Sequence, residues 1–399
     1  MCAADLRSSR PRRRVVLAMD YYLRLIHEGV VRYAQEANWH LDSSMHHEGV
    51  PPGDWFGDGA LVMVRTPKMR SFVRRLRVPA VSLAVRPKGL RLPSVLMDNA
   101  QAGRLGARHL LSRGFRHLAF YLPQRHPVAE ERALGFADEV TAAGRILYEL
   151  AWPGTRTAGR RASRATWLVE QLRALPKPLA VMAEDDKWAL ETMEACHRAG
   201  LNVPADVAVL GVDNDPLLTT VGWVPLSSVD IDLPGLGYRA ARWLDALMDG
   251  RRHPEAEREP GGPEGDQYHP PLGVVARRST DALCVEQPDV REALAFLLTH
   301  FHEPITVAEV ARHTCLSLRR LQVHFKRFVG QSIQETLLKL RLENAKRLLR
   351  DTSLKIDAVA RQSGFANGNY LARVLRRTAR ARPTDLRLRR RESAMERRV

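Results

Sequence analysis

Hydrophobic residues recur with two different periods along this chain, and the change of period divides it into two parts. Up to about Val275, short apolar runs alternate with longer stretches in which apolar positions recur every three or four residues. The short runs are typical of buried strands and the longer stretches of amphipathic helices. Strands that alternate with helices predict right-handed crossovers and parallel sheets.

The apolar runs predicted as strands span residues 15–19, 59–64, 79–85, 94–99, 117–122, 179–186 and 207–215. Helices are expected over 26–37, 69–76, 100–114 and 132–144, with another that ends near Gly200. This number of strands suits two lobes, with a ligand in the crevice beyond the carboxyl ends of the strands. We therefore predict a two-lobed α/β domain over 14–280, in which the Pro-, Gly- and Glu-rich stretch 253–271 is a loop or linker.

The last third of the chain has no strand-like runs and predicts an all-α domain over 287–390. Thr306 followed by Glu309 is a capping-box signature, and Ser317 and Asn367 are predicted N-caps of later helices. Between those caps, the segment from Ser332 to about residue 350 predicts one straight helix. At about 1.5 Å per residue this helix is about 30 Å long, close to one turn of B-DNA.

The same helical signature occurs twice in this domain. The first copy reads ITVAEVARHTCLSLRRLQVHFKR from Ile305, and the second reads LKIDAVARQSGFANGNYLARVLRR from Leu354. Each copy has Val-Ala-Arg on a first helix, then a short turn, then a basic second helix. Two such units, over about 306–328 and 355–378, predict two helix-turn-helix motifs that read two stretches of DNA major groove.

The charge of the chain is concentrated at the same end. The formal net charge is +17, and from Val285 onward there are 24 Lys or Arg residues against 12 Asp or Glu residues. An excess of this kind in one part of a chain indicates a nucleic-acid-binding domain. Hydrophobic residues make up 45% and charged residues 27%, which is ordinary for a soluble globular protein.

Apolar residues at i and i+4 on each second helix predict which side chains face the DNA. Leu321 and Phe325 in the first unit, and Leu371 and Leu375 in the second, should face the core. The outward residues are then Arg319, Arg320, Gln322, Val323 and Lys326 on one helix and Asn369, Tyr370, Arg373 and Arg376 on the other. Arg can bind guanine, Gln and Asn can bind adenine, and the remaining cations should contact phosphates.

The region from about Pro288 to Arg387 resembles the DNA-binding domain of the AraC family. The signature lies in the second unit, where Ala360, Gly364 and Phe365 form the turn and Pro383 and Arg387 close the motif. The resemblance implies base contacts from Arg319, Gln322 and Val323 and from Asn369 and Arg373. Leu375, Arg380 and Leu386 depart from the usual Phe, Gly and Tyr, and Val323 stands where Arg is common.

The first two-thirds of the chain resembles the periplasmic-binding-protein-like core of the lac-repressor family. The matching segments include MDNAQAG from Met97, GVDND from Gly211, PLSSV from Pro225 and ARRSTD from Ala276. Taken together, the two domains resemble the xylose-operon activators (XylR type). The resemblance implies a sugar sensor with parallel sheets, placed before the DNA-binding domain.

A sugar site needs hydrogen-bonding charged groups and an aromatic platform. Asp213 ends a predicted strand, and Arg132 lies in the Arg-x-x-Gly-Phe pattern of the family. Asp185 occupies the place where these sensors usually carry Asn, a difference that can change the ligand. Tyr21 and Tyr22 follow the first strand, where the loop that lines the cleft belongs. These five residues are the predicted ligand-binding set.

No apolar span is long enough for a signal sequence or a membrane helix, and the four cysteines have no metal-ligand spacing. We therefore expect a cytoplasmic protein without a cofactor, and neither a catalytic nor a metal site is predicted. A sugar-transport binding protein would need an export signal, and an alkylation-repair regulator would need a reactive cysteine motif. The expected function is a transcriptional activator that binds promoter DNA and responds to xylose or a related sugar, as a homodimer that contacts RNA polymerase. A constitutive DNA-binding protein with a vestigial or non-sugar sensor is the alternative.

Overall fold

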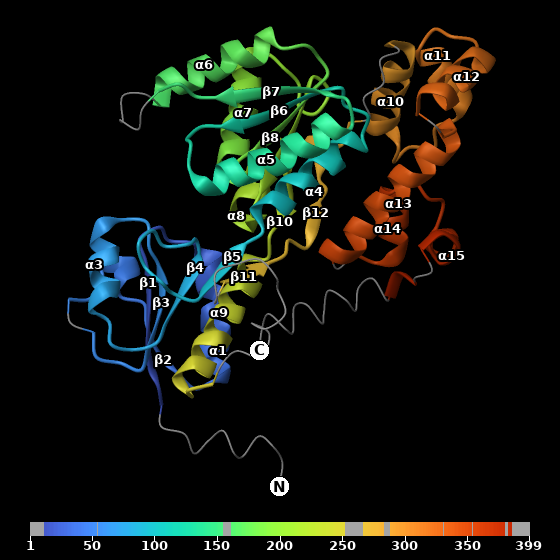
Figure 1. The fold of residues 1–399 in the computed structure, drawn as a ribbon. Coiled ribbons are helices and arrows are strands. Elements are labelled where there is room, and N and C mark those ends of the chain that lie inside the picture. The colour runs from blue at the N-terminus through green and yellow to red at the C-terminus, as the bar shows by residue number, and fades with distance from the viewer. Residues whose placement is uncertain are drawn as a thin grey trace. The chain divides into compact units, whose positions relative to one another are not determined.

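The computed structural model describes residues 12–53, 55–154, 161–251, 266–282, 288–329, 331–352, 354–379 and 382–384. The chain forms two compact units, of which the second contains all residues from Asp281 onward (Figure 1). Among the described helices, none is both long enough and apolar enough to span a bilayer.

The first lobe of the α/β unit is built on a six-stranded parallel sheet in the order β11-β5-β4-β3-β1-β2. Its central strands are almost wholly buried, because apolar residues occupy both faces of each strand. The elements of this lobe are β1 (Arg14–Met19), α1 (Arg24–Glu36), β2 (His40–Asp42), α2 (Met45–Glu48), β3 (Gly59–Met63), α3 (Pro67–Arg75), β4 (Ala80–Ala84), β5 (Ser94–Met97), α9 (Leu233–Met248) and β11 (Asp266–His269).

The second lobe has its own six-stranded sheet, in the order β12-β10-β9-β8-β6-β7. Strand β12 is antiparallel to β10, whereas β10 with β9 and β6 with both β7 and β8 are parallel. Its elements are α4 (Asn99–Leu111), β6 (His117–Leu122), α5 (Pro127–Ala142), β7 (Ile146–Ala151), α6 (Arg161–Ala174), β8 (Leu179–Ala183), α7 (Asp186–Ala199), β9 (Val207–Val212), α8 (Pro216–Thr219), β10 (Ser227–Asp230) and β12 (Gly273–Val275).

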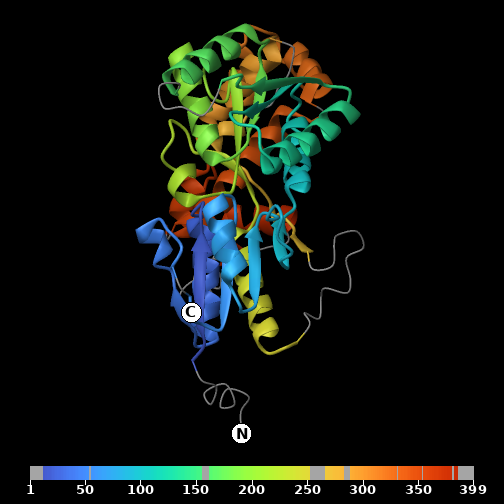
Figure 2. The ribbon, with the colours of Figure 1, turned by 60° about the vertical axis from the view of Figure 1, so that its left-hand side comes forward.

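The chain passes between the lobes three times. It leaves the first lobe after β5, returns as α9 to pack on α1 and on strands β3 to β5, and crosses again between β11 and β12. Figure 2 shows the yellow helix α9 beside the blue strands of the first lobe, although these strands are far from α9 in sequence. The two-lobed parallel architecture predicted from the sequence is therefore confirmed.

The predicted strands are all present, but five further strands were not predicted. These are β2, β7, β10, β11 and β12, which lie toward or at the edges of the sheets. The prediction that 253–271 is a loop is wrong at its end, because Asp266–His269 form strand β11 and pair with β5. The part of that stretch from 253 to 265 lies outside the described residues.

The second unit contains six helices among its described residues: α10 (Pro288–His300), α11 (Val307–His313), α12 (Leu318–Val329), α13 (Ile333–Asp351), α14 (Ile356–Gln362) and α15 (Gly368–Ala379). They form two apolar cores, one for each repeat. Helix α13 contributes to both, since Ile333 and Leu337 lie in the first core and Ala345 and Leu349 in the second. The predicted connecting helix thus holds the two repeats together.

The predicted helix caps are present. The side chains of Thr306 and Glu309 form a complete capping box at α11. Ser317 Oγ accepts a hydrogen bond from the backbone N–H of Arg320 at 3.4 Å, and Asn367 Oδ1 accepts one from Tyr370 at 2.9 Å. These polar side chains fix where the second helix of each repeat begins.

Candidate functional site

Three carboxylates lie where two parallel strands of the second lobe end. Glu184 and Asp185 follow β8, and Asp213 follows β9. Because the carboxyl ends of parallel strands share one edge of a sheet, residues almost thirty positions apart meet there. The charges of Asp185 and Glu184 both raise the pKa of Asp213.

Arg132 on α5 is the cation of this group. Its side chain is 3% exposed, and its Nη2 lies 3.5 Å from Asp213 Oδ1. Nε donates to Asn99 Oδ1 at 3.1 Å, and Nη1 donates to the backbone carbonyl of Glu184 at 2.6 Å. The guanidinium is therefore fixed on three sides by α4, the end of β8 and the end of β9.

Two glycines set the position of Arg132. A Cβ atom on Gly135 would lie 2.0 Å from the carbonyl oxygen of Ala100, and one on Gly103 would lie 2.1 Å from that of Arg132. Helices α4 and α5 can approach this closely only because both positions lack a side chain. The close contact brings Arg132 beside Asn99, the first residue of α4.

Asp213 and Asp185 have shifted acidities for a common reason. Burial raises the pKa of Asp213 to about 7, against the opposing charge of Arg132. Burial likewise raises the pKa of Asp185 to about 6, although its Oδ1 accepts a hydrogen bond from Trp188 N at 3.0 Å and caps α7. Asp213 also has a backbone φ of 104°, in the region that disfavours side chains. Such strain is found where a fold fixes a functional side chain.

The sequence did not single out Glu184 or His126. Glu184 is 6% exposed, and its Oε1 lies 2.5 Å from His126 Nε2. Its Oε2 is buried and has no hydrogen-bond partner among the described residues. The adjacent Asp186 has a structural role, since its two oxygens accept from Ser228 Oγ at 2.6 Å and Asp215 N at 2.8 Å.

Tyr21 faces these carboxylates from the first lobe. Burial and the charges of Asp185 and Asp213 raise the pKa of its hydroxyl. The guanidinium of Arg65, which follows β3, lies 4.7 Å from the centre of the Tyr21 ring. Four of the five predicted ligand-binding residues (Arg132, Asp185, Asp213 and Tyr21) thus gather in one place.

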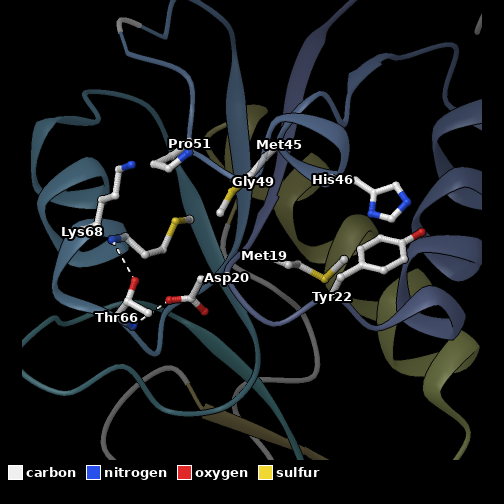
Figure 3. Close-up of a pocket in the computed structure, with 10 residues that line it drawn as sticks. Met19, Asp20, Tyr22, Met45, His46, Gly49, Pro51, Thr66 and Lys68 are labelled. Atoms are coloured by element: carbon white, nitrogen blue, oxygen red, sulfur yellow. Dashed lines mark hydrogen bonds between the residues drawn. The ribbon is translucent and has the colours of Figure 1, made fainter. Parts of the chain in front are cut away.

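Tyr22 lies elsewhere. Its ring stacks on His46 with 3.6 Å between ring centres, and its hydroxyl is 2.9 Å from His27 Nδ1. Figure 3 shows Tyr22 at the edge of a pocket of about 380 Å³ that is lined by the end of β1 and by α2 and α3. Tyr21 and Tyr22 thus contribute to different sites, although they are adjacent in the bend and loop that follow β1.

The second helix of each repeat exposes the predicted DNA-reading residues. On α12, Leu321 and Phe325 are fully buried, while Arg319, Arg320, Gln322, Val323 and Lys326 are exposed. On α15, Leu371 and Leu375 are fully buried, while Asn369, Tyr370, Arg373 and Arg376 are exposed. The predicted orientation of both helices is therefore confirmed. Gly368, which offers no side-chain donor, is buried against Asp357.

The described residues contain no group of three or more His, Cys, Asp or Glu side chains that could hold a metal ion.

Both parts of the chain are similar to known domains. Residues 107–280 match a periplasmic binding protein-like domain, and residues 310–389 match a helix-turn-helix domain. The Xylose operon regulatory protein of Escherichia coli (strain K12) is 26% identical over 383 residues, which cover 92% of this chain and 94% of that protein. The protein of the same name from Haemophilus influenzae is 24% identical and covers 93% and 96%.

A solved structure of the xylose-binding transcription activator xylR is similar over the same length. It superposes with a TM-score of 0.66 at 25% identity, and the match covers 94% of this chain and 98% of that one. The similarity therefore includes both domains and their order along the chain.

Proposed function

We propose that this chain, a transcription regulator homologous to the xylose operon regulatory proteins, activates transcription when xylose or a related sugar binds between the lobes of its sensor. The homology extends over both domains. One observation carries the sensor half of the proposal: Arg132, Asp213 and Asp185 gather at the strand ends and face Tyr21 on the other lobe. A protein of this kind is a regulator and not an enzyme.

The chemistry of the group suits a polyol. Asp213 can accept hydrogen bonds from two adjacent hydroxyls, and Arg132 can donate to a ring or hydroxyl oxygen. Tyr21 is 45% exposed and offers an apolar ring face to the carbon skeleton. Because these residues come from both lobes, a bound sugar would favour the closed arrangement by its higher affinity for it.

The DNA-binding half follows from the two basic helices. Exposed Arg319, Gln322 and Arg373 can read bases in two major-groove segments, and Lys326 and Arg376 can neutralise phosphates. We expect the regulator to act in the cytoplasm as a homodimer on promoter DNA and to contact RNA polymerase there. Sugar binding would change how the two DNA-binding domains of the dimer occupy their sites.

Calorimetric titration of the full-length protein with a panel of pentoses and hexoses tests the sensor. We expect at least one sugar to bind wild type, and Asp213→Ala to abolish that binding. Glu149→Gln is the matched control, because it removes a carboxylate of the same lobe that pairs with Arg125 outside the cluster. Footprinting on the promoter with and without the bound sugar then tests regulation. Identical footprints under both conditions would exclude a sugar-responsive activator.

A further inference from the structure

One segment of the first lobe is strongly basic, although it lies outside the DNA-binding unit. Residues 59–97 contain nine Lys or Arg residues and no Asp or Glu. The resulting charge of +9 compares with +12 for the whole region from Val285 onward. Surfaces of soluble proteins usually mix both signs, and charge of one sign destabilises a folded state by self-repulsion. A segment of this composition therefore indicates a partner of opposite charge.

Helix α3 carries part of this charge on its outer face. Figure 1 shows α3 on the opposite side of the first-lobe sheet from α1 and α9. Its apolar side chains are buried in the core of the lobe, whereas Arg74 and Arg75 in its last turn are exposed, as is Arg77 just after it. Cations in a last turn suit the helix dipole, but the dipole gives no reason for the cations that follow in the next loop.

The loop between β4 and β5 adds its cations to the same surface. Leu90 and Leu92 of this loop pack against the apolar cluster that buries α3. A Cβ atom on Gly89 would lie 3.9 Å from Arg74 Nη2, so the loop runs beside the end of the helix. The exposed cations of the helix end and the loop form what we call the basic face, which consists of Arg74, Arg75, Arg77, Lys88 and Arg91.

The basic face is not neutralised by the protein itself. None of its five cations forms an ion pair with a carboxylate among the described residues. The other cations of the segment differ in this respect, since Arg86 pairs with Asp266 and Arg65 lies over the ring of Tyr21. The basic face is therefore available to a polyanion.

The side chains of the segment decide which polyanion fits. Phe72 is the only aromatic residue in 59–97 and is 2% exposed, so the face has no ring on which the bases of a single strand could stack. Helix α3 buries its apolar face in the core of the lobe, so it has no apolar face to insert into a membrane surface. Cations alone suit the phosphate backbone of a duplex, which is recognised by charge.

We propose that the basic face binds the phosphate backbone of duplex DNA that flanks the sites read by the two helix-turn-helix repeats. The inference extends DNA contact to the sensor unit and does not depend on which sugar the sensor binds. Lys and Arg side chains that neutralise phosphates add affinity without sequence information. Because the helix-turn-helix units hold DNA on the same chain, the flanking duplex is present at a high effective concentration, at which weak contacts are occupied.

The length of the flanking DNA tests the proposal on the full-length protein. The probes are two duplexes with one binding site, which the protein selects from a random pool, and with flanks of about half a helical turn or about three turns. We expect wild type to bind the long duplex about tenfold more tightly than the short one at low salt. The slope of log affinity against log salt should be steeper by about 2–3 on the long duplex, since each neutralised phosphate contributes about 0.9. Fluorescence anisotropy measures both quantities.

Two variants with the same net charge locate the effect. The first neutralises four cations of the basic face, and the second neutralises four exposed cations of the second lobe. The face variant combines Arg74→Gln, Arg75→Gln, Lys88→Gln and Arg91→Gln, and the control variant combines Arg108→Gln, Arg125→Gln, Arg145→Gln and Arg198→Gln. We expect only the face variant to lose the advantage of the long duplex, whereas any effect of lower net charge is common to both.

Lys88 provides a second measurement that needs no variant and so does not depend on how well the face variant folds. Its acetylation by an amine-reactive reagent is followed by mass spectrometry on the wild-type protein. We expect Lys88 to react more slowly in the complex with the long duplex than in the complex with the short one. Lys187, which is exposed on α7 of the second lobe, should react at the same rate in both complexes.

The outcomes separate this inference from the proposed function. If wild type gains no affinity from the long flanks and Lys88 reacts equally in both complexes, the basic face does not bind DNA and the proposal is overturned. Equal losses for the two variants on the long duplex would also overturn it, since net charge and not the position of the cations would then explain the loss. Neither result affects the sugar sensor, which is tested by titration with sugars.

Discussion

The chemistry of Asp213 depends strongly on its surroundings. Its position at a strand end was predictable from the apolar run that precedes it, as was the position of Asp185. The group that they form was not predictable in full. Glu184 belongs to it because its charge acts on Asp213, and His126 because its Nε2 lies 2.5 Å from Glu184 Oε1, 58 positions away. The contact of His126 depends on tertiary packing, and no spacing in the sequence reports it.

Replacement of Asp213 tests this environment through stability. Burial raises the pKa of Asp213 to about 7, whereas an unfolded Asp titrates near about 4. Between these values the folded state binds the extra proton, so wild-type stability should fall as the pH rises from about 4 to about 7. Asp213→Asn removes that loss. The free energy of unfolding of Asp213→Asn, relative to wild type, should therefore be about 1–2 kcal/mol higher at pH 8 than at pH 5, after allowance for the partial exposure of the side chain.

The measurement is urea denaturation at a series of pH values, followed by tryptophan fluorescence. All seven tryptophans lie at or before Trp243, so the signal reports the sensor unit. Glu149→Gln serves as the control and should show no such trend. A stability difference between Asp213→Asn and wild type that stays constant from pH 5 to pH 8 would contradict an ionisable Asp213 of raised pKa.

The elements show which parts of a fold a sequence can report. Strands buried on both faces, such as β3 and β8, are continuous apolar runs and were predicted. Strands β2 and β11 read HLD and DQYH, and they are strands only because β1 and β5 offer unpaired backbone groups beside them. Such edge strands take their conformation from pairing, which local composition does not encode.

The turn within each helix-turn-helix repeat gives a prediction about backbone conformation. Gly364 has φ of 76°, and Cys315 occupies the same place in the first repeat with φ of 54°. In both turns the next residue donates its N–H to the carbonyl oxygen of the alanine five residues before it, Phe365 to Ala360 and Leu316 to Ala311. The first repeat thus holds a cysteine in a left-handed conformation that favours glycine.

We expect Cys315→Gly to stabilise the DNA-binding unit by about 0.5–1 kcal/mol, because glycine removes the left-handed strain. Gly364→Ala should destabilise it by about 2 kcal/mol, since it adds that strain and a Cβ that would lie 2.4 Å from the carbonyl oxygen of Phe301. Helical circular dichroism during urea denaturation measures both. Cys315→Ala is the control and should change little, and a destabilising Cys315→Gly would refute the comparison of the two turns.

The two recognition helices should differ in how their residues contribute to DNA binding. Gln322→Ala and Arg373→Ala each remove a side chain able to read a base, and each should cost about 1–3 kcal/mol on the preferred site and relax specificity at one position. Lys326→Ala should weaken binding to all sequences alike and lower the slope of log affinity against log salt by about 1. Fluorescence anisotropy at several salt concentrations distinguishes these results. Equal losses on specific and random DNA for Gln322→Ala would remove it from base readout.

At the scale of the whole molecule, the order of the two domains was easier to predict from the sequence than the edge strands or the site residues within them. The change from a strand-and-helix pattern to helices alone predicts the boundary, and the second compact unit contains Asp281 onward together with Leu111–Arg116 and Pro204–Ala208. Each unit has its own apolar core, as the clusters around Val62 and around Val310 illustrate. Two units with separate cores can fold separately, so a functional connection between them has to be measured as a coupling free energy.

That coupling distinguishes a switch from a DNA-binding protein with a vestigial sensor. If the bound sugar changes the affinity for promoter DNA by some factor, promoter DNA must change the affinity for the sugar by the same factor. We expect a factor of about 5 to 150, the usual range for allosteric proteins. The cycle is closed by titrating sugar into the free protein and into its complex with promoter DNA, and by titrating DNA with and without sugar. Asp213→Ala should not bind sugar, so its affinity for promoter DNA should be the same with and without sugar, and it serves as the control for the DNA titrations. Equal sugar affinities for the free and the DNA-bound protein would mean that the sensor and the helix-turn-helix units act independently, and the chain would then bind its promoter constitutively.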